Sequence, residues 1–598
     1  MLYTLTFTAA MAGLAAAATT ALPYTSAVDG TDYVWKSTVA YGELPATLID
    51  AFGDSLGGIG SAIAVKRWRS NGDGTYSGTI VAQPDRGHNT VSLENYGARQ
   101  QYIDFVLRPC AAATCHTDPS APSLSLTYTG GMKYIDASPR NQNGGYTSGL
   151  DAINVRPASG LFTELPEVED GNNALSTDME GLALMADGSF WSSDEYGPSI
   201  YHISADGTIL SNIPVPDAFL PHTDAGVLDF ATEEDVNVVS GRAPNQGFEG
   251  LTISPDNTRL YALLQSALLQ DQDLSDDTTI QFTRLVVYDI TNVDDPSLIE
   301  EYVVELPKSS SKVYAASEVH YVNDNTLLVL ARDGKGNGNG NSPSSTATTK
   351  QLTSDEKEIG IISLVGATNI VGLYDGVGEA VAPNGVLDSS ITPVAFNNLI
   401  SIIDAAQLAR FGLQNGPPLA TDIVGKFGES LAIAPALDPA NPDDYFVFTL
   451  ADNDFINTDE YFDGVFQGPD PYGTNVPNAA FVYRVTLPGA LYPQCTSFLL
   501  LPPYLLDRSL NPSGLARRRI RRSDNCSPHL DACSLGGGRF ECVDVASDLE
   551  QCGACSADGG VDCVSLPGVA GVECVQGACV IDSCTDEFKL VEDACVVI

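Results

Sequence analysis

The chain has 598 residues, and 76 acidic against 30 basic residues give it a formal net charge of −46. A surface of that sign repels polyphosphate backbones, which argues against nucleic acid as a partner. The composition (43% hydrophobic residues, 55 Gly and 35 Pro) favours strands joined by turns over long helices.

The first 21 residues have the features of a signal peptide. From Leu2 to Ala18 the chain is uncharged and mostly apolar or small, and small residues at 16–21 offer cleavage sites. This run is too short for a membrane span, and no later stretch reaches about 18 uninterrupted apolar residues. We therefore expect a secreted, extracellular protein without a membrane span.

An internal repeat runs through residues 22–505, which we assign to one large domain. Each copy begins with a short strand, and in the clearest copies this strand contains Glu-Gly-Leu. The glutamates Glu180, Glu249 and Glu318 follow one another at intervals of 69 residues. About 15 residues later, most copies have a second strand that ends in polar residues. The copies start at Met179, Phe248, Ser317 and Gly428, with a degenerate copy at Gly58.

Units of about 70 residues with several short strands cannot bury their sheets alone. Arranged radially, the sheets cover one another's faces and leave only short edges, as in a β-propeller. Five copies are visible, and the gaps at 58–180 and 318–429 have room for one more. We therefore predict an all-β propeller of six blades, with seven as the alternative.

Two further segments follow the large domain. Residues 506–525 form a basic linker, interpreted either as solvated chain or as a dibasic processing site at Arg517–Arg522. Ten of the 13 cysteines lie in residues 526–598, a density that predicts a disulfide-rich module in an exported chain. A zinc site at Cys552 and Cys555 is the alternative, disfavoured because no His lies between Cys533 and Cys595.

The repeated glutamates indicate a functional site. The innermost strand of each blade lines the central channel of a propeller, so a glutamate at one position per blade predicts a ring. Clustered carboxylates need a cation, shared protons or basic partners. Ca²⁺ suits an all-oxygen cage in an extracellular protein. The expected catalytic residues are Glu180, Glu249, Glu318, Glu429 and Asp85, and the expected ligands of a divalent metal are Glu180, Glu249, Asp194, Glu195, Asp452 and Asp454.

Basic residues beside the same motifs are expected to bind substrate. Arg86, Arg332 and Lys426 can hold an anionic group, or they can neutralise the ring. The alternative for the whole cluster is a structural network of salt bridges and backbone caps that pins the blades together. The string Gly53–Gly57 matches a serine-esterase elbow, but it precedes the first blade and lacks a downstream Asp and His block, so we expect no serine triad.

Several strings of the large domain recur in a known family. They are Asp85-Arg86-Gly87, Asp178 with Glu180-Gly181-Leu182, Ser193–Tyr196, Gly247–Leu251, Arg332-Asp333 and Asp452–Phe455. In these strings the chain resembles the phytase-like family labelled "esterase-like activity of phytase", over about residues 45–490. The resemblance implies hydrolysis of phosphate esters or related esters. We therefore expect a metal-assisted hydrolase of a small anionic or ester substrate, and the alternative is a non-catalytic binding or scaffold propeller at the cell surface.

The C-terminal module contains two characteristic strings, Asp548–Cys555 and Gly577–Cys579. In these strings it resembles the C-terminal module of PriA-type fungal fruiting-body proteins. This resemblance implies a fungal, secreted or cell-surface setting, in which the module is the expected contact with a cell-wall or surface partner.

Overall fold

The computed structural model describes most of the large domain and parts of the C-terminal module. The described ranges are 21–87, 95–115, 122–168, 171–232, 237–336, 348–416, 427–462, 464–468, 475–492 and segments between 531 and 597. The linker at 506–525 and nearly all of the expected signal peptide lie outside these residues. The chain divides into two compact units, Met1–Ser497 and Phe498–Ile598.

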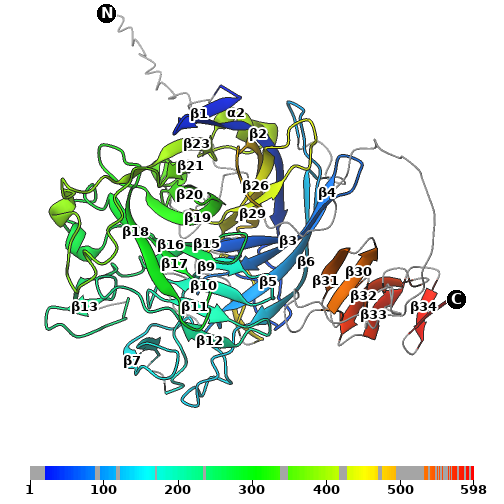
Figure 1. The fold of residues 1–598 in the computed structure, drawn as a ribbon, viewed down its shortest axis with the longest axis horizontal. Helices are drawn as coiled ribbons and strands as arrows, with labels where there is room; N and C mark the ends of the chain where they lie inside the picture. Colours follow the sequence, from blue (N-terminus) through cyan, green and yellow to red (C-terminus); the bar gives the residue numbers. More distant parts are fainter. Residues whose placement is uncertain are drawn as a thin grey trace, which may run out of the picture. The chain divides into compact units, whose positions relative to one another are not determined.

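Five sheets of four or more strands form the main body of the described part of the first unit (Figure 1). We call them blades 1 to 5. Blade 1 contains β3 (Ala62–Ser70), β4 (Tyr76–Gln83), β5 (Arg99–Leu107) and β6 (Leu124–Lys133). Blade 2 contains β9 (Met179–Leu184), β10 (Phe190–Asp194), β11 (Ile200–Ile203) and β12 (Ile209–Asn212). Blade 3 contains β15 (Phe248–Ile253), β16 (Arg259–Leu264), β17 (Phe282–Asp289), β18 (Ser297–Glu305) and β22 (Val394–Ala395). Blade 4 contains β19 (Ala315–Asn323), β20 (Thr326–Arg332), β21 (Lys357–Ser363) and β23 (Asn397–Ser401).

Blade 5 joins the two ends of the propeller. Its strands are β24 (Phe427–Gly428), β25 (Ala432–Pro435), β26 (Asp444–Asp452), β29 (Asn478–Thr486), β2 (Thr31–Leu44) and β1 (Tyr24–Val28). β2 pairs antiparallel with β29 from Val34↔Thr486 to Leu44↔Asn478. This pairing of the first and last parts of the domain closes the ring.

The innermost strands follow one another around the channel. β9 packs against β3 and β15, β15 also packs against β19, and β25 packs against β3. The Glu318 carboxylate of blade 4 accepts hydrogen bonds from backbone amides of blades 3 and 5 and so joins these blades. The ring is therefore complete with five blades among the residues that the structure describes.

The sixth blade predicted from the spacing is not confirmed. The gap after Gly58 is filled by blade 1 itself, because the degenerate copy leads directly into β3. The described residues 134–168 and 171–178 then form isolated bridges and the hairpin of β7 (Asn154–Arg156) and β8 (Leu165–Glu167). The gap after Glu318 holds blade 4 and a connection near 364–393. Among the described residues of these two gaps, long connections and not an extra sheet therefore account for the irregular spacing.

Glycine follows the glutamate in the best repeats because the inner strands pack backbone against backbone. A Cβ atom at Gly250 would lie 2.5 Å from the backbone nitrogen of Val319 in the next blade. A Cβ atom at Gly181 would lie 2.4 Å from Cβ of Leu251. These distances are too short for any side chain, so the motif sets the spacing between neighbouring blades.

We expect Gly250→Ala to destabilise the propeller by about 2 kcal/mol, because the added methyl group must displace the backbone of β19. Chemical denaturation of the purified protein measures this change. Gly428→Ala is the matched control, since its Cβ would meet only Ile402 Cδ1, at an ordinary 3.7 Å. Equal stability of the two variants would contradict this account of the repeat.

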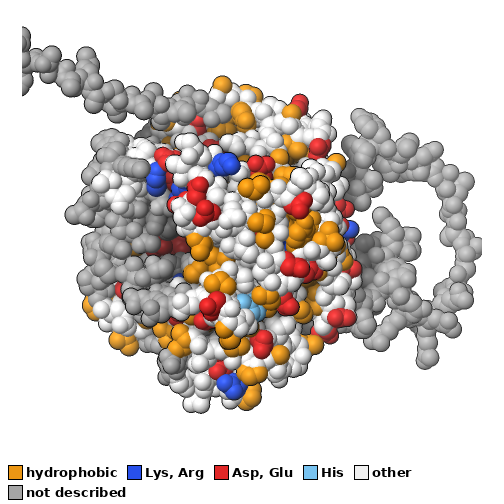
Figure 2. Space-filling model, turned by 90° about the vertical axis from the view of Figure 1, so that its left-hand side faces the viewer, with side chains coloured by type: hydrophobic (Ala, Val, Ile, Leu, Met, Phe, Trp, Pro, Cys, Tyr) orange, Lys and Arg blue, Asp and Glu red, His pale blue; other side chains and the backbone are white. Residues whose placement is uncertain are grey.

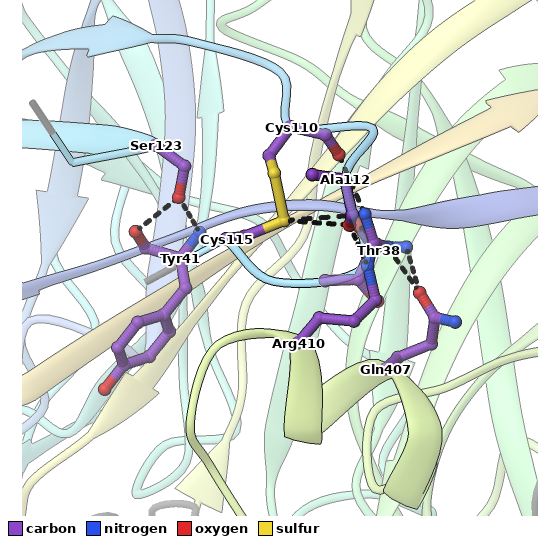
Figure 3. Close-up of a disulfide and its surroundings, with 8 residues drawn as sticks. All are labelled: Thr38, Tyr41, Cys110, Ala112, Cys115, Ser123, Gln407 and Arg410. Atoms are coloured by element: carbon purple, nitrogen blue, oxygen red, sulfur yellow. Dashed lines mark hydrogen bonds between the residues drawn. A yellow bond between two sulfur atoms is a disulfide. The ribbon is translucent and has the colours of Figure 1, made fainter. Parts of the chain in front are cut away.

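A disulfide between Cys110 and Cys115 closes the small loop after β5. Helix α2 (Ala405–Arg410) holds this loop, because the Arg410 guanidinium donates to the carbonyl oxygens of Cys110 at 2.9 Å and Ala112 at 3.1 Å (Figure 3). The same side chain donates to the carbonyl oxygen of Thr38 on β2 at 2.6 Å. The loop of blade 1 is thus tied to the strand that closes the ring.

The described part of the second unit consists of two-stranded hairpins and disulfides. Cys552 is bonded to Cys574 and Cys563 to Cys579. These bonds confirm the predicted disulfide framework, and the zinc alternative is wrong because the Cys552 sulfur is in a disulfide. The hairpins pair β30 (Asp531–Gly536) with β31 (Arg539–Val543), β32 (Val569–Val575) with β33 (Ala578–Cys584), and β34 (Phe588–Val591) with β35 (Ala594–Val597).

The remaining elements are short. They are β13 (His222–Thr223), β14 (Val238–Ser240), β27 (Glu460–Phe462), β28 (Val465–Gly468), α1 (Thr349–Leu352), and the 3₁₀ turns η1 (Leu269–Asp271) and η2 (Pro383–Gly385). Within the described ranges, no helix is long and apolar enough to cross a membrane. On the face shown in Figure 2, acidic side chains are widely spread and basic ones are few, as the net charge requires.

Candidate functional site: an acidic cavity in the propeller channel

The repeat brings its polar residues to one end of the channel. The first two strands of each blade are antiparallel, so the start of the first strand and the end of the second lie at the same end of the sheet. In blade 2, Met179 pairs with Asp194, which places Glu180 and Glu195 at that end. The same geometry applies to Glu249 and Gln265 in blade 3.

A cavity of about 260 Å³ lies at this end, and all five blades contribute to it. Among the described residues that line it, seven are carboxylic acids and only Arg332 is a cation. We call it the acidic cavity. Its lining residues are Asp85, Glu180, Glu195, Pro244, Asn245, Gln246, Glu249, Gln265, Arg332, Glu429, Asp452 and Asp454.

Most of the residues predicted from the sequence meet in this cavity. Eight of them line it: Asp85, Glu180, Glu195, Glu249, Arg332, Glu429, Asp452 and Asp454. Glu318, Asp194 and Arg86 are buried outside its lining. Lys426 lies outside the described residues.

Glu318 and Asp194 bind backbone amides instead of facing the cavity. The Glu318 Oε1 atom accepts from the backbone N–H groups of Leu251 at 3.0 Å and Val319 at 2.9 Å. The Asp194 carboxylate accepts from the backbone N–H groups of Asp178 and Gly197, both at 2.9 Å. These two carboxyl groups are backbone caps that pin inner strands, as the structural interpretation of the cluster predicted.

Arg86 neutralises an acidic residue behind the cavity wall. Its Nε atom lies 3.1 Å from Asp178 Oδ2, and both side chains are fully buried. The guanidinium also donates to Asn245 Oδ1 at 2.6 Å and lies over the Tyr196 ring at 4.6 Å. Arg86 therefore orients Asp178 and is not placed to bind a substrate directly.

The electrostatics of the cavity favour protonated acids or a bound cation. Burial raises the pKa of five lining carboxyl groups well above the usual range, and neighbouring carboxylates raise most of these pKa values further. Burial lowers the pKa of the Arg332 guanidinium, but the negative charges of Glu429 and Glu249 together have the larger effect, so that the pKa is raised. The five acids are Asp85, Glu180, Glu195, Glu249 and Asp452.

Three carboxylates are spaced as ligands of one cation. Oxygen atoms of Asp85, Asp178 and Glu180 all lie within 4.8 Å of one another. Because Ca²⁺–oxygen distances are about 2.3–2.6 Å, ligands on opposite sides of one ion are separated by about 5 Å. The donor set is oxygen only, so the three residues fit a hard divalent cation.

Asp178 was not predicted as a ligand, although a signal for it was present. Asp178 and Glu180 are two residues apart at the start of a strand, and such residues face the same side. The amides of Gln265, Asn245 and Gln246 were also missed. Gln265 Nε2 donates to Glu195 Oε1 at 3.1 Å and, by a shorter bond, to Glu249 Oε1, so one amide holds two acids together.

The esterase-like string at 53–57 has a structural role. Ser55 is buried, its N–H donates to the carbonyl oxygen of Tyr461, and its Oγ accepts from the Tyr461 N–H. Asp54 forms ion pairs with Arg99 at 2.8 Å and Lys133 at 3.3 Å. These contacts agree with the expectation that no serine triad forms here.

The fold and the site thus define a β-propeller with a buried acidic cavity at one end of its channel. The family model "Phytase-like: Esterase-like activity of phytase" matches residues 76–399. A relative from Arthroderma benhamiae, described as "Uncharacterized secreted protein", is 31% identical over 466 residues, which cover 71% of this chain and 88% of the relative. The chain therefore belongs to the phytase-like family.

Other comparisons concern the C-terminal module and the fold. The family model "Protein CPL1-like" matches residues 540–596. Among solved structures, a luciferin-regenerating enzyme is 12% identical with a TM-score of 0.25, covering 75% of this chain and 97% of that one. The Malassezia sympodialis allergen Mala s 1 is 9% identical with a TM-score of 0.28, covering 76% and 89%. Both TM-scores are too low to carry a conclusion.

Proposed function

We propose that this protein is a secreted hydrolase of small phosphate esters or related esters that acts with a divalent cation, Ca²⁺ being the best match. The observation that carries the proposal is the group of Asp85, Asp178 and Glu180, whose oxygens lie within 4.8 Å of one another. Two members of this group, Asp85 and Glu180, line a cavity that is built by all the blades described. Membership of the phytase-like family supports ester hydrolysis, and the secreted relative supports export.

A cation explains how so acidic a cavity accepts an anionic ester. Seven lining carboxyl groups face one Arg332, so the cavity repels phosphate when these groups are ionised and offers it one cationic side chain when they are protonated. Asp85, Asp178 and Glu180 would hold the cation, and Arg86 fixes the Asp178 carboxylate through an ion pair at 3.1 Å and a backbone hydrogen bond at 3.2 Å. When bound, a divalent cation offsets the negative charge and polarises a phosphoryl or acyl oxygen.

The other lining residues supply positioning and proton transfer. Gln265 holds the Glu195 and Glu249 carboxyl groups side by side, where one can accept a proton from an attacking water. Arg332 is ion-paired with Glu429, and its guanidinium is the lining group suited to an anionic oxygen of the substrate. Each of these roles uses a charged or hydrogen-bonding group that already faces the cavity.

Metal analysis and an ester panel test this proposal together. The purified protein should contain or take up a divalent metal in about stoichiometric amount, and it should hydrolyse at least one phosphate or carboxylate ester. A chelator should abolish the hydrolysis, and added Ca²⁺ should restore it. The metal-assisted mechanism would be overturned if the protein took up no divalent metal, or if the rate of hydrolysis were unchanged by the chelator.

The size and charge of the cavity predict a preference for monoesters. At about 30 Å³ per water, a volume of 260 Å³ holds roughly nine waters. Inositol hexakisphosphate has a phosphate on every ring carbon, each with a charge of about −1.5 to −2. We expect kcat/KM for a small monophosphate to exceed that for inositol hexakisphosphate by about 100-fold, measured as released phosphate. Equal values would show that substrate does not enter this cavity.

The alternative function is a non-catalytic binding or scaffold propeller at the cell surface. It is favoured by Glu318 and Asp194, which cap backbone amides and hold strands together. In that case the whole acidic cluster would stabilise the fold, and the Cys-rich module would contact a cell-wall or surface partner. Substitution of cavity carboxylates separates the two functions. A hydrolase would lose turnover and remain folded, whereas a scaffold propeller would lose its folded structure.

A further inference from the structure

The hairpin of β3 and β4 carries a group of cations in a strongly acidic protein. Lys66, Arg67 and Arg69 are all exposed at the end of β3. Within the described residues, none of the three forms an ion pair with an Asp or Glu. Elsewhere in the propeller such pairs are common, as between Arg99 and Asp50 at 2.7 Å. With 76 acidic and 30 basic residues in the chain, an exposed group of unpaired cations needs an explanation.

A β-bulge brings these cations to one exposed region. The pairing of β3 with β4 shifts between Lys66 and Arg69, and Arg67 has a φ of 55°. This left-handed conformation is uncommon for a residue with a long side chain. In a regular strand successive side chains alternate between the two faces, so the cations of this segment would be divided between them. The bulge interrupts this alternation of side chains, and all three cations remain exposed.

Trp68, which lies among these cations in sequence, anchors the bulge to the core. Its ring stacks on that of Tyr76 with centroids 5.0 Å apart, and it packs edge-on against Phe446 and Phe448. Its indole N–H donates to the carbonyl oxygen of Pro435 at 2.9 Å. The neighbouring cations are therefore carried by a fixed strand and not by a loose turn.

The positive charges of Lys66, Arg67 and Arg69 repel one another. Partial burial and the positive charge of Arg67 both lower the pKa of Lys66. Arg108 adds a further cation close by, at the end of β5, where Leu107 pairs with Tyr76. An anionic partner would relieve this repulsion, since its charge would be shared by several cations.

The rest of the hairpin is polar and suits a hydroxyl-rich partner. Asn71 Nδ2 lies 2.8 Å from both Thr75 Oγ1 and Ser77 Oγ, so amide and hydroxyl groups line the turn. No large apolar side chain between residues 66 and 79, all of which are described, is among the strongly exposed ones. Asp73 at the turn adds one negative charge.

We propose that the β3–β4 hairpin binds an anionic polysaccharide through Lys66, Arg67 and Arg69, which pair with its carboxylate, phosphate or sulfate groups. Sugar hydroxyls find hydrogen-bonding partners in the polar turn. At physiological salt, electrostatic interactions are screened over about 8 Å. A flexible, sparsely charged polysaccharide is therefore attracted by the nearby cations more strongly than it is repelled by acidic groups farther away.

Two other anionic partners fit the hairpin less well. A bilayer surface is usually bound through 4–8 clustered cations or with the help of apolar side chains, and the hairpin presents too few cations and a polar turn. Nucleic acid presents a dense row of phosphates, which the net charge of −46 repels.

Binding by the full chain to three anionic polysaccharides tests the proposal. Polygalacturonate, a phosphorylated mannan and dextran sulfate distinguish carboxylate, phosphate and sulfate, and neutral dextran controls for sugar hydroxyls alone. We expect at least one anionic polymer to bind at physiological ionic strength and Lys66→Gln/Arg69→Gln to weaken it by about 10-fold or more. Phosphatidylserine vesicles and duplex DNA, measured in parallel, should bind more weakly than that polymer.

A matched variant controls for net charge. Lys308→Gln/Lys312→Gln also removes two exposed cations, but from the segment between β18 and β19. It should leave the affinity within about twofold of that of the unaltered chain, and thermal melting should show that both variants are folded. The proposal is overturned if no anionic polysaccharide binds, if the two variants weaken binding equally, or if vesicles or DNA bind more tightly.

Discussion

Replacement of Glu180 and Glu249 together by Gln is expected to lower kcat/KM for the best ester substrate by about 10³-fold or more. Both side chains line the acidic cavity, where Glu180 belongs to the cation-binding group and Glu249 is held beside Glu195. Gln preserves the shape of Glu but removes its charge and its ability to take a proton, and loss of general acid–base catalysis alone typically costs 10²–10⁴-fold. Steady-state hydrolysis of 4-nitrophenyl phosphate, or of the best ester found, measures the change.

The control for this double variant is Glu301→Gln. Glu301 is also fully buried, but its Oε1 atom is 3.0 Å from the Arg284 guanidinium, in blade 3 and outside the cavity lining. This variant should lose stability and keep its kcat. If the cavity variant unfolds while the control does not, the scaffold function gains support. If the cavity variant is folded and fully active, the proposed site is wrong.

The second large effect is a loss of stability as pH rises in the absence of a cation. Burial raises the pKa of Asp194 to about 8 and that of Glu358 to about 8. In the unfolded chain these groups lose their protons near pH 4, so between pH 4 and 8 the folded protein holds more protons than the unfolded one. The free energy of unfolding must therefore fall across this window, by an amount on the order of several kcal/mol.

Saturating Ca²⁺ should offset part of this loss, because a ligand that binds only the folded state stabilises it by about 2.7 kcal/mol at 100 times its Kd. Thermal melting at pH 5 and pH 8, with and without Ca²⁺, measures both effects. The gain from Ca²⁺ should be larger at pH 8, where fewer protons compete for the carboxylates. Asp85→Asn should remove that gain. Stability that rises from pH 5 to pH 8, or an equal gain in Asp85→Asn, would contradict this account.

The sequence predicted the position of the site because two patterns coincide at one end of each blade. The glutamate at the start of the first strand and the polar residues at the end of the second strand both repeat along the chain. Antiparallel pairing then places Glu180 and Glu195, or Glu429 and Asp452, at the same end of the channel. The closure of the ring by β2 and β29 could not be predicted in this way, since these strands carry no copy of the motif.

Equivalent positions in the repeat do not guarantee equivalent side-chain directions. Glu318 occupies the same repeat position as Glu249, yet its carboxylate turns to the amides of Leu251 and Val319. Neither the Gly nor the Leu that follows Glu180 and Glu249 is present after Glu318, where Val319 and His320 stand instead, and this departure was the available warning. Arg86 was misjudged for a related reason, because its buried partner Asp178 comes from a different blade. Contacts between blades depend on how neighbouring sheets pack. The spacing of a repeat along the sequence carries no information about that packing.

The central claim is that carboxylates from separate blades meet around one axis and hold a divalent cation. Anomalous diffraction from crystals of the full chain grown with Ca²⁺ tests it most directly. We expect an anomalous peak in the acidic cavity, in contact with Asp85, Asp178 and Glu180. No peak there at saturating Ca²⁺, or electron density that places these three carboxylates apart, would contradict the claim.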